Sequence, residues 1–380
     1  MTRPLAGIRI LDLTRLLPGG VCTMLLADMG AEIIKIEAPD GGDYARWMPP
    51  LIDGQGAYFA ATNRGKKSVI LNLKDAQGQA ILRRMAARAD VLIESYRPGV
   101  MDRLNVGYEA LKKLNPRLIF CALSGWGADG AYAERSGHDL NYASVAGLIG
   151  EMNTPQPMGG QVADIGGAYA AAAGISAALV GRERTGEGAF LDISLFESAL
   201  PFMALAWVES VLPGDHTRGG LSGKVACYNV YTALDGRAVA LAALEPKFWA
   251  NFCGAVGRPD LIDGYTDPGR QRYLTDELAQ MFALKTADEW GELLEGADCC
   301  FTRVNTPAQA LNDPHVRGRQ ALGLTWSGVP YLHSPIRMSG DLPSITPAPG
   351  YGEHTRAVLL DFGYTDAEID VLCAASVIKE

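Results

Sequence analysis

The sequence predicts an α/β protein with a large Rossmann-like parallel-sheet domain and a smaller α+β domain. Short apolar runs punctuate the first third of the chain, at 8–14, 31–37, 67–73, 90–96 and 118–126, with helix-like segments between them. Strands that alternate with helices indicate a parallel sheet with right-handed crossovers. The length of 380 residues exceeds the size at which one core usually keeps growing. A change of pattern near residue 223 marks where the second domain begins.

The middle of the chain continues the large domain. Residues 163–181 are rich in Ala and Gly and nearly free of charge, which predicts a wholly buried helix whose neighbours approach closely. Residues 186–200 then predict a turn, a strand and another helix.

The smaller domain begins with two alternating runs within 223–244, joined by Leu-Asp-Gly-Arg. This pattern predicts a hairpin with an Asp-Gly turn. Helical patterns follow at 246–296, and a terminal helix is expected at 365–375. We therefore divide the chain into a large domain, a small domain and a C-terminal segment that returns to the large domain, at 1–222, 223–329 and 330–380.

Composition narrows the classes of function. The net charge is −9 and the pI about 5.2, so no basic surface for nucleic acid is expected. We expect no apolar run to reach the roughly 18 residues of a membrane helix, and the first residues do not resemble a signal peptide. The seven cysteines show no metal-ligand spacing. We expect reduced thiols, no metal site and a cytoplasmic location.

Three side chains could carry chemistry, and each has a structural alternative. His138 stands at a loop-to-helix junction in Gly-His-Asp, where a histidine is more often structural than chemical. Asp164 begins the small-residue helix, where it could cap the helix or face a substrate together with an imidazole. Glu245 precedes Pro246, so it could start a helix or fix the tautomer of a histidine.

Several basic residues could form an anion site. Arg97 and Arg103 suit an anion, although solvated surface arginines are the commoner case. Residues 63–68, Asn-Arg-Gly-Lys-Lys-Ser, gather three positive charges in an otherwise acidic chain. Such a local reversal suggests a bound phosphate, with a plain surface loop as the alternative. The chain lacks a G-x-G-x-x-G turn after its first strand, so dinucleotide binding has little support.

Four ordered blocks together resemble the CaiB/BaiF, or class III, coenzyme A transferase family over nearly the whole chain. They are "PLAGIRILDLTRLLPGG…LLADMGAEIIKIE", "NRGKKSVILNLKDAQG", "ADVLIESYRPGVMDRLNVGYEAL" and "NPRLIFCALSGWG". The segments "GHDLNY" at 137–142, "ADIGG" at 163–167 and "EPKFW" at 245–249 are similar to the branch that racemises 2-methylacyl-CoA thioesters.

The resemblance implies a racemase or epimerase of lipid metabolism that needs no catalytic cofactor and binds the CoA thioester as its substrate. It implies that His138 and Asp164 are the acid/base pair and that Glu245 orients His138. It also implies CoA contacts on the large domain, at Arg64, Leu71, Leu73, Lys74, Ser95, Tyr96, Arg97, Arg103, Gly137, Asp139, Asn141 and Tyr142. Lys66 is expected to meet the nucleotide phosphates together with Arg64. Backbone N–H groups at the start of the Asp164 helix are candidate donors to the enolate oxygen.

This chain departs from the family pattern at one position, and two other functions remain as alternatives to the racemase. Family members often carry an arginine where this chain has Ala38, so another group must supply that phosphate contact. The family forms interlocked homodimers, in which Glu245 would act on His138 of the other subunit. The first alternative function is a CoA transferase with Asp164 as nucleophile, and the second is a CoA-binding protein without catalysis. Met152 and Met158 are candidate contacts for a tolerant acyl site.

Overall fold

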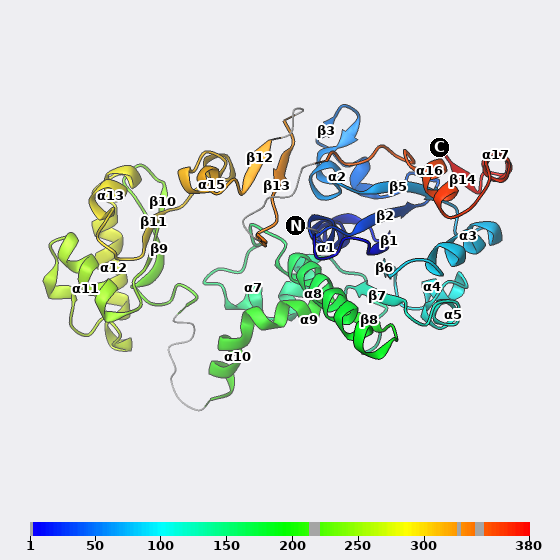
Figure 1. Ribbon diagram of the computed structural model, residues 1–380. Helices are drawn as coiled ribbons and strands as arrows, with labels where there is room; N and C mark the ends of the chain where they lie inside the picture. Colours follow the sequence, from blue (N-terminus) through cyan, green and yellow to red (C-terminus); the bar gives the residue numbers. More distant parts are fainter. Residues whose placement is uncertain (1–2, 213–220, 325–327, 339–345) are drawn as a thin grey trace. The chain divides into compact units, whose positions relative to one another are not determined.

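The computed structural model describes residues 3–212, 221–324, 328–338 and 346–380. The chain divides into two compact units (Figure 1). One contains Met1–Ala146, Met158–Leu200 and Pro314–Glu380, and the other contains Gly147–Pro157 and Pro201–Asp313. The first unit is therefore assembled from three separate stretches of sequence.

A seven-stranded sheet forms the centre of the first unit, in the order β14-β5-β2-β1-β6-β7-β8. Every neighbouring pair from β5 to β8 is parallel, and only the short β14 is antiparallel, to β5. This confirms the parallel α/β sheet that the alternating pattern predicts. The strands are β1 (Arg9–Leu13), β2 (Glu32–Glu37), β5 (Lys67–Leu71), β6 (Val91–Glu94), β7 (Ile119–Ser124), β8 (Phe190–Ser194) and β14 (Ile378–Lys379).

Strands β1, β2, β5 and β6 bury residues on both of their faces, as expected for a parallel sheet with helices on both sides. In β1, Leu11 and Leu13 face a core shared with α3, α16 and α17, while Asp12 faces Thr23 of α1 on the other side. The helices are α1 (Leu16–Asp28), α2 (Ala57–Thr62), α3 (Ala76–Ala86), α4 (Val100–Arg103), α5 (Tyr108–Lys112), α6 (Asp139–Val145), α8 (Val162–Thr185), α9 (Leu195–Ala199), α15 (Pro314–Gly318), α16 (Thr355–Asp361) and α17 (Asp366–Ala374). Short pieces complete the unit: η1 (Tyr44–Arg46), β3 (Leu51–Ile52), β4 (Gln55–Gly56), β12 (Leu322–Leu324) and β13 (Pro330–Leu332).

The long helix α8 corrects two of the sequence expectations. It packs against α1, β7, β8 and α9, yet Tyr169 is 41% and Val180 56% exposed, so it is not wholly buried. By length and composition alone it is also apolar enough to cross a membrane, contrary to the expectation that no segment reaches that length. Core helices pass the same test, and the packing of α8 along the sheet is that of a core helix on one side.

The second unit has its own antiparallel sheet, in the order β11-β10-β9. Strands β9 (Tyr228–Thr232) and β10 (Ala238–Ala242) form the hairpin expected around the Asp-Gly turn, in which Gly236 has a φ of +76°. Trp249, Phe252 and Phe282 are fully buried behind this sheet. The other elements are α7 (Leu148–Glu151), η2 (Leu200–Met203, which begins at the unit boundary), α10 (Ala204–Val211), α11 (Pro246–Ala255), η3 (Pro259–Leu261), η4 (Pro268–Arg270), α12 (Gln271–Phe282), α13 (Ala287–Leu294), β11 (Phe301–Arg303) and α14 (Pro307–Ala310).

Candidate active site

A cavity of about 430 Å³ lies at the carboxyl edge of the large sheet, among the segments that follow β1, β2, β5 and β6. Parallel strands bring their carboxyl ends to one edge, and α/β proteins bind ligands there. The cavity brings together four of the residues predicted to contact CoA: Leu71, Leu73, Lys74 and Tyr96. Ala38, which stands where relatives often have arginine, lines the same cavity.

Arg15 is a residue of this cavity that the sequence reasoning missed. Its guanidinium lies over the rings of Tyr44 and Tyr96, at 5.1 and 5.6 Å from their centroids, and its Nη1 donates to the Tyr44 hydroxyl at 3.0 Å. Within the described part of the chain it makes no ion pair with a carboxylate. Arg15 therefore brings a guanidinium to the cavity that contains Ala38. The available signal was an arginine two residues after the buried strand β1, at the edge of the sheet where α/β proteins bind ligands.

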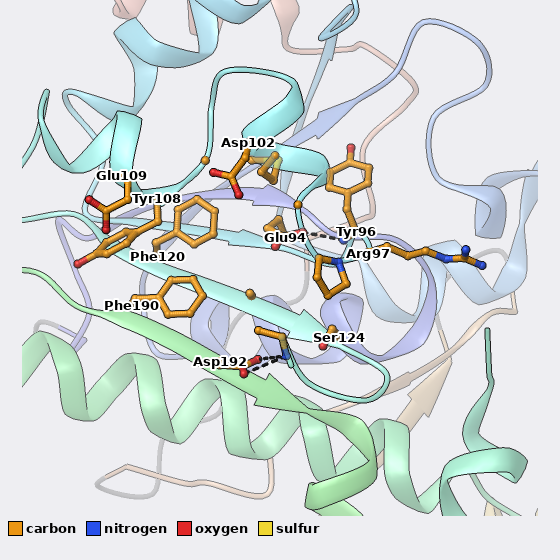
Figure 2. Close-up of a pocket in the computed structure, with 16 residues that line it drawn as sticks. Glu94, Tyr96, Arg97, Asp102, Tyr108, Glu109, Phe120, Ser124, Phe190 and Asp192 are labelled. Atoms are coloured by element: carbon orange, nitrogen blue, oxygen red, sulfur yellow. Dashed lines mark hydrogen bonds between the residues drawn. The ribbon is translucent and has the colours of Figure 1, made fainter. Parts of the chain in front are cut away.

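Ser95, Arg97 and Arg103 lie in the segment after β6. The Ser95 hydroxyl accepts a hydrogen bond from the backbone N–H of Arg15 at 3.1 Å, which ties this segment to the one after β1. Arg97 and Arg103 are exposed, and neither guanidinium forms an ion pair among the residues that the structure describes. Figure 2 shows the Arg97 side chain extending away from Glu94 and Asp102. Both cations are thus available to an anion.

Arg64 and Lys66 are not available in this way. The Arg64 guanidinium is buried and donates to both carboxylate oxygens of Asp28, at 2.5 and 2.6 Å, and to the Leu332 carbonyl. The Lys66 ammonium is buried against Asp12, and burial lowers its pKa to about 8. The structure thus corrects the expectation that these two residues meet the nucleotide phosphates, because their charges are already engaged inside the protein.

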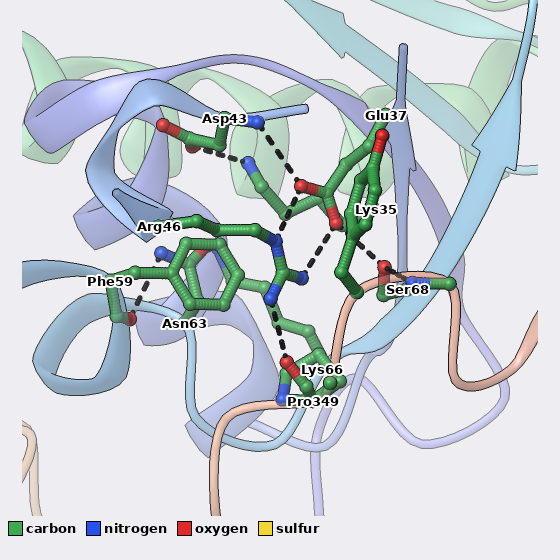
Figure 3. Close-up of polar contacts among 12 residues, drawn as sticks. Lys35, Glu37, Asp43, Arg46, Phe59, Asn63, Lys66, Ser68 and Pro349 are labelled. Atoms are coloured by element: carbon green, nitrogen blue, oxygen red, sulfur yellow. Dashed lines mark hydrogen bonds and ion pairs between the residues drawn. The ribbon is translucent and has the colours of Figure 1, made fainter. Parts of the chain in front are cut away.

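A network of buried ions nearby fixes the loop after β2 (Figure 3). Glu37 accepts from Arg46 through both carboxylate oxygens, at 2.8 and 2.7 Å, and the Arg46 guanidinium lies 3.7 Å over the Phe59 ring. Arg46 also donates to the Pro349 carbonyl at 3.0 Å. Asp43 pairs with Lys35 at 2.9 Å and accepts from the backbone N–H of Leu16. Because these contacts join distant segments, they hold the walls of the cavity and the C-terminal segment in place.

The candidate acid/base residues lie at the starts of two adjoining helices, α6 and α8. His138 is the N-cap residue of α6, and Asp164 is in the first turn of α8. Between them stands Asp139, whose Oδ1 accepts hydrogen bonds from the backbone N–H groups of Ala163 at 2.7 Å and Asp164 at 3.0 Å. His138 is therefore connected to Asp164 through the next residue, Asp139, whose side chain accepts the Asp164 backbone N–H. The cap of α8 is Asp139, so the alternative that Asp164 itself caps this helix is not realised.

The remaining residues of 137–142 fix this junction. The backbone N–H of His138 donates to Asn141 Oδ1 at 3.1 Å, and the Tyr142 hydroxyl donates to the Gly137 carbonyl at 2.7 Å. The Tyr142 ring packs edge-on against Trp126, with centroids 4.9 Å apart. A Cβ at Gly137 would come within 2.8 Å of that ring, so only glycine fits there. These residues build the support for His138, and their expected contacts with CoA stay predictions.

The surroundings of Asp164 change its acidity. Burial, and then the negative charge of Asp139, raise the pKa of Asp164 to about 7. The same neighbourhood raises the pKa of Tyr142 to about 12, chiefly through burial. A carboxyl group with a pKa near neutrality can both donate and accept a proton at physiological pH. The enolate donors expected at the start of α8 need a correction, because two of those N–H groups are already bonded to Asp139.

Glu245 and the two candidate methionines stand elsewhere. Glu245 is the N-cap residue of α11 with Pro246 at the first helical position, which confirms the helix-start alternative. Its side chain makes no capping hydrogen bond. Glu245 and Met152 belong to the second unit, and Met158 belongs to the first. The predicted pairing of Glu245 with His138 of another subunit stays a prediction.

The model of CoA-transferase family III matches residues 5–355, nearly the whole chain. The chain belongs to that family. It is 34% identical to "Alpha-methylacyl-CoA racemase" of Mus musculus, with 96% of this chain and 95% of the relative covered. It is also 35% identical to "Acetyl-CoA:oxalate CoA-transferase" of Acetobacter aceti, covering 96% and 97%. Among solved structures, a CaiB/BaiF family protein from Brucella suis superposes with a TM-score of 0.83 at 30% identity, covering 95% of this chain and 100% of that one.

These matches bear out the family that the sequence blocks predict, and they bear out its fold. They do not choose between the two chemistries, because a racemase and a transferase match at similar identity. The choice depends on the site.

Proposed function

We propose that this family member is an α-methylacyl-CoA racemase, which interconverts the (R) and (S) forms of 2-methylacyl-CoA thioesters by 1,1-proton transfer. The observation that carries the proposal is the Asp139 bridge. It joins the start of α6, where His138 is the N-cap residue, to the start of α8, whose first turn contains Asp164. The pKa of the Asp164 carboxyl group is raised to about 7. In the proposed reaction the His138 imidazole and this carboxyl group face one substrate. These are two groups that can exchange roles as acid and base.

In one direction, His138 takes the α-proton from one face of the thioester and an enolate forms. The Asp164 carboxylic acid then gives its proton to the opposite face, which inverts the α-carbon. The pair ends with the proton on His138 and a carboxylate at Asp164, which is the starting state for the reverse direction. The pair therefore holds one proton before and after the reaction and two while the enolate exists, and no metal or redox cofactor takes part.

The CoA part of the substrate would occupy the cavity at the carboxyl edge of the sheet. Leu71, Leu73 and Tyr96 offer apolar walls, and Lys74 offers a cation at the rim. Arg15 would supply the charge that Ala38 does not, because a guanidinium suits the geometry of a phosphate. Arg97 and Arg103 add exposed cations in the segment that follows β6.

Three further elements of the proposal come from the family resemblance. Glu245 orients His138 across an interlocked homodimer, which would complete each site with a residue of the second subunit. The enzyme is cytoplasmic. Its role lies in lipid metabolism, on acyl chains that a branched methyl group makes chiral.

A CoA transferase is the second candidate function, favoured by the similar match to the oxalate transferase. In that reaction the Asp164 carboxylate attacks the thioester carbonyl, an anhydride forms and CoA leaves as a thiolate. A nucleophile should be ionised, whereas burial beside Asp139 favours the protonated form of Asp164. The raised pKa therefore supports proton transfer over nucleophilic attack.

The test uses one enantiomer of 2-methyldecanoyl-CoA in deuterated water, with optical activity and mass followed together. The proposal predicts loss of optical activity with uptake of one deuterium at the α-carbon. His138→Ala should abolish the loss of optical activity for either enantiomer. A parallel reaction contains free oxalate or succinate. Transfer of CoA to the added acid without α-deuterium would contradict the racemase and support the transferase.

A further inference from the structure

A second cavity of about 470 Å³ lies beside β6, β7 and β8, within the first unit (Figure 2). Its walls come from the last residue of β6, from residues along β7 and β8, and from α4 and α5. Among its lining residues are Glu94, Asp102, Tyr108, Phe120, Phe190 and Asp192. None of these six takes part in the proposed proton transfer, so the cavity calls for an explanation of its own.

Glu94 is the most unusual of these residues. It is the last residue of β6 and only 7% exposed, yet it lines the cavity. Its Oε2 accepts a hydrogen bond from the backbone N–H of Tyr96 at 2.6 Å. Its Oε1 has no hydrogen-bond partner among the described residues, and none of their cations forms an ion pair with it. A buried carboxylate normally has a cationic partner, because burying an unpaired charge is costly.

The nearest charges to Glu94 are also negative, so they add to the need for a cationic partner. Burial, followed by the charges of Asp102 and Asp192, raises the pKa of Glu94 to about 7, despite the Tyr96 hydrogen bond. Asp102 comes from α4 and Asp192 from β8, so three separate elements contribute carboxylates. Asp192 is itself held by the backbone N–H of Ala128, at 3.2 and 3.0 Å. In Figure 2 the Arg97 guanidinium extends away from this group.

The other end of the cavity is aromatic. Tyr108, Phe120 and Phe190 form a mutual cluster, with ring centroids 5.3 to 5.9 Å apart. Phe190 is 43% exposed, so this apolar surface is accessible to a ligand. Aromatic faces attract organic cations as well as apolar groups. The cavity thus combines an apolar wall with a group of carboxylates. Arg97 also lines the cavity, but among the described residues neither it nor any other cation forms an ion pair with these carboxylates.

We propose that this cavity binds an organic ammonium ion, whose charge meets Glu94, Asp102 and Asp192 and whose apolar body packs on Tyr108, Phe120 and Phe190. The site goes beyond the proposed racemase chemistry and does not depend on it. The ligand class is a primary amine attached to an aromatic or aliphatic body. The ammonium group supplies the cationic partner that Glu94 lacks among the residues described by the structure.

The experiment is calorimetric titration of the full-length protein with 2-phenylethylamine at pH 8, where Glu94 is mostly ionised. Saturable binding at one site per chain is expected. The neutral analogue 2-phenylethanol should bind about tenfold more weakly or worse, because it loses the charge-assisted hydrogen bond. Equal binding of amine and alcohol would overturn the proposal, as would no binding of the amine.

Variants locate the site. Glu94→Gln and Asp192→Asn keep the size and an acceptor oxygen, and each should weaken amine binding about tenfold. Glu187→Gln removes an exposed carboxylate outside the cavity and should leave binding unchanged. If Glu94→Gln and Asp192→Asn both bound the amine like the natural protein, the site would lie elsewhere and the proposal would be wrong. Competition between 2-phenylethylamine and CoA would also contradict it, by placing the cavity within the thioester site.

Discussion

Asp164 is the single side chain on which the proposed chemistry depends most. Its pKa of about 7 has two causes, burial and the neighbouring charge of Asp139. Asp139 is not an accidental neighbour, because it must stand there to cap α8. Asp139 therefore stabilises the junction through its hydrogen bonds and raises the pKa of Asp164 through its charge. A substitution that removes only the charge can separate these two effects.

The rate should depend on pH in a way that reports Asp164. Racemisation requires one proton on the pair, so kcat/KM should fall for both enantiomers as the pH rises above about 7, where Asp164 loses its proton. Asp139→Asn keeps an acceptor for α8 but removes the charge, so this fall should move to lower pH. Glu187→Gln, far from the junction, should not move it. An unchanged profile in Asp139→Asn would contradict this origin of the raised pKa.

The same pKa predicts a cost in stability. The pKa of Asp164 is raised from 3.8 to about 7, so the folded state holds the proton more tightly than the unfolded state. Below pH 3.8 both states are protonated and the residue costs nothing. The cost grows as the pH rises and is complete above about 7. Asp164→Asn should therefore raise the free energy of unfolding at pH 8 but not at pH 4, as measured by urea titration. An equal effect at both pH values would argue against the shift.

For single residues, the sequence indicated the candidate acid/base side chains but not the residues to which they are hydrogen-bonded. The segment 137–142 indicated His138 as a candidate acid/base, and the start of the small-residue helix indicated Asp164. The role of Asp139 depends on a contact to a residue 24 positions away, which no local pattern contains. Arg64 was misjudged for the same reason, since its partner Asp28 is 36 residues distant.

At the scale of elements, the junction of α6 and α8 is the structure that makes the site. Helix α8 has Gln161 at its N-cap position, without a side-chain hydrogen bond, and takes its cap from another helix. A cap supplied from outside fixes the position of one helix relative to the other as well as satisfying N–H groups. Sequence pattern predicted α8 itself, although it missed the exposed side that carries Tyr169 and Val180.

Removing this cap should therefore affect more than stability. Asp139→Ala leaves two N–H groups of α8 without their acceptor and should lower the free energy of unfolding by about 1 kcal/mol. It also releases the start of α6, so kcat should fall more in Asp139→Ala than in Asp139→Asn. Chemical denaturation and initial rates measure the two effects. Equal rates in the two variants would show that the bridge does not position the pair.

At the scale of the whole molecule, the chain closes its first unit with its last residues. Strand β14 pairs with β5, and Arg46 donates to the Pro349 carbonyl. The alternation of strands and helices predicted the parallel sheet, because that pattern is local. The antiparallel edge strand, and the assembly of the unit from three stretches of sequence, depend on contacts across more than 300 residues, as between Arg46 and Pro349. Local patterns do not contain such contacts.

The buried pair of Arg46 and Glu37 should be essential to this closure. Arg46→Met leaves Glu37 buried without its guanidinium and should cost about 3–5 kcal/mol. Glu183→Gln breaks the exposed pair with Arg117 at 2.9 Å and should cost less than about 1 kcal/mol. Urea titrations of the two variants measure both values. Similar losses would mean that the buried pair contributes no more than a surface one.

The proposed racemisation depends on two groups that act on opposite faces of one α-carbon. The most direct measurement is α-deuterium exchange of each separate enantiomer in deuterated water, with the variants His138→Gln and Asp164→Asn. Each variant should fail to racemise, yet each should still exchange the α-proton of one enantiomer, and the two variants should exchange opposite enantiomers. Exchange of both enantiomers by His138→Gln, or of neither by both variants, would contradict the two-base site.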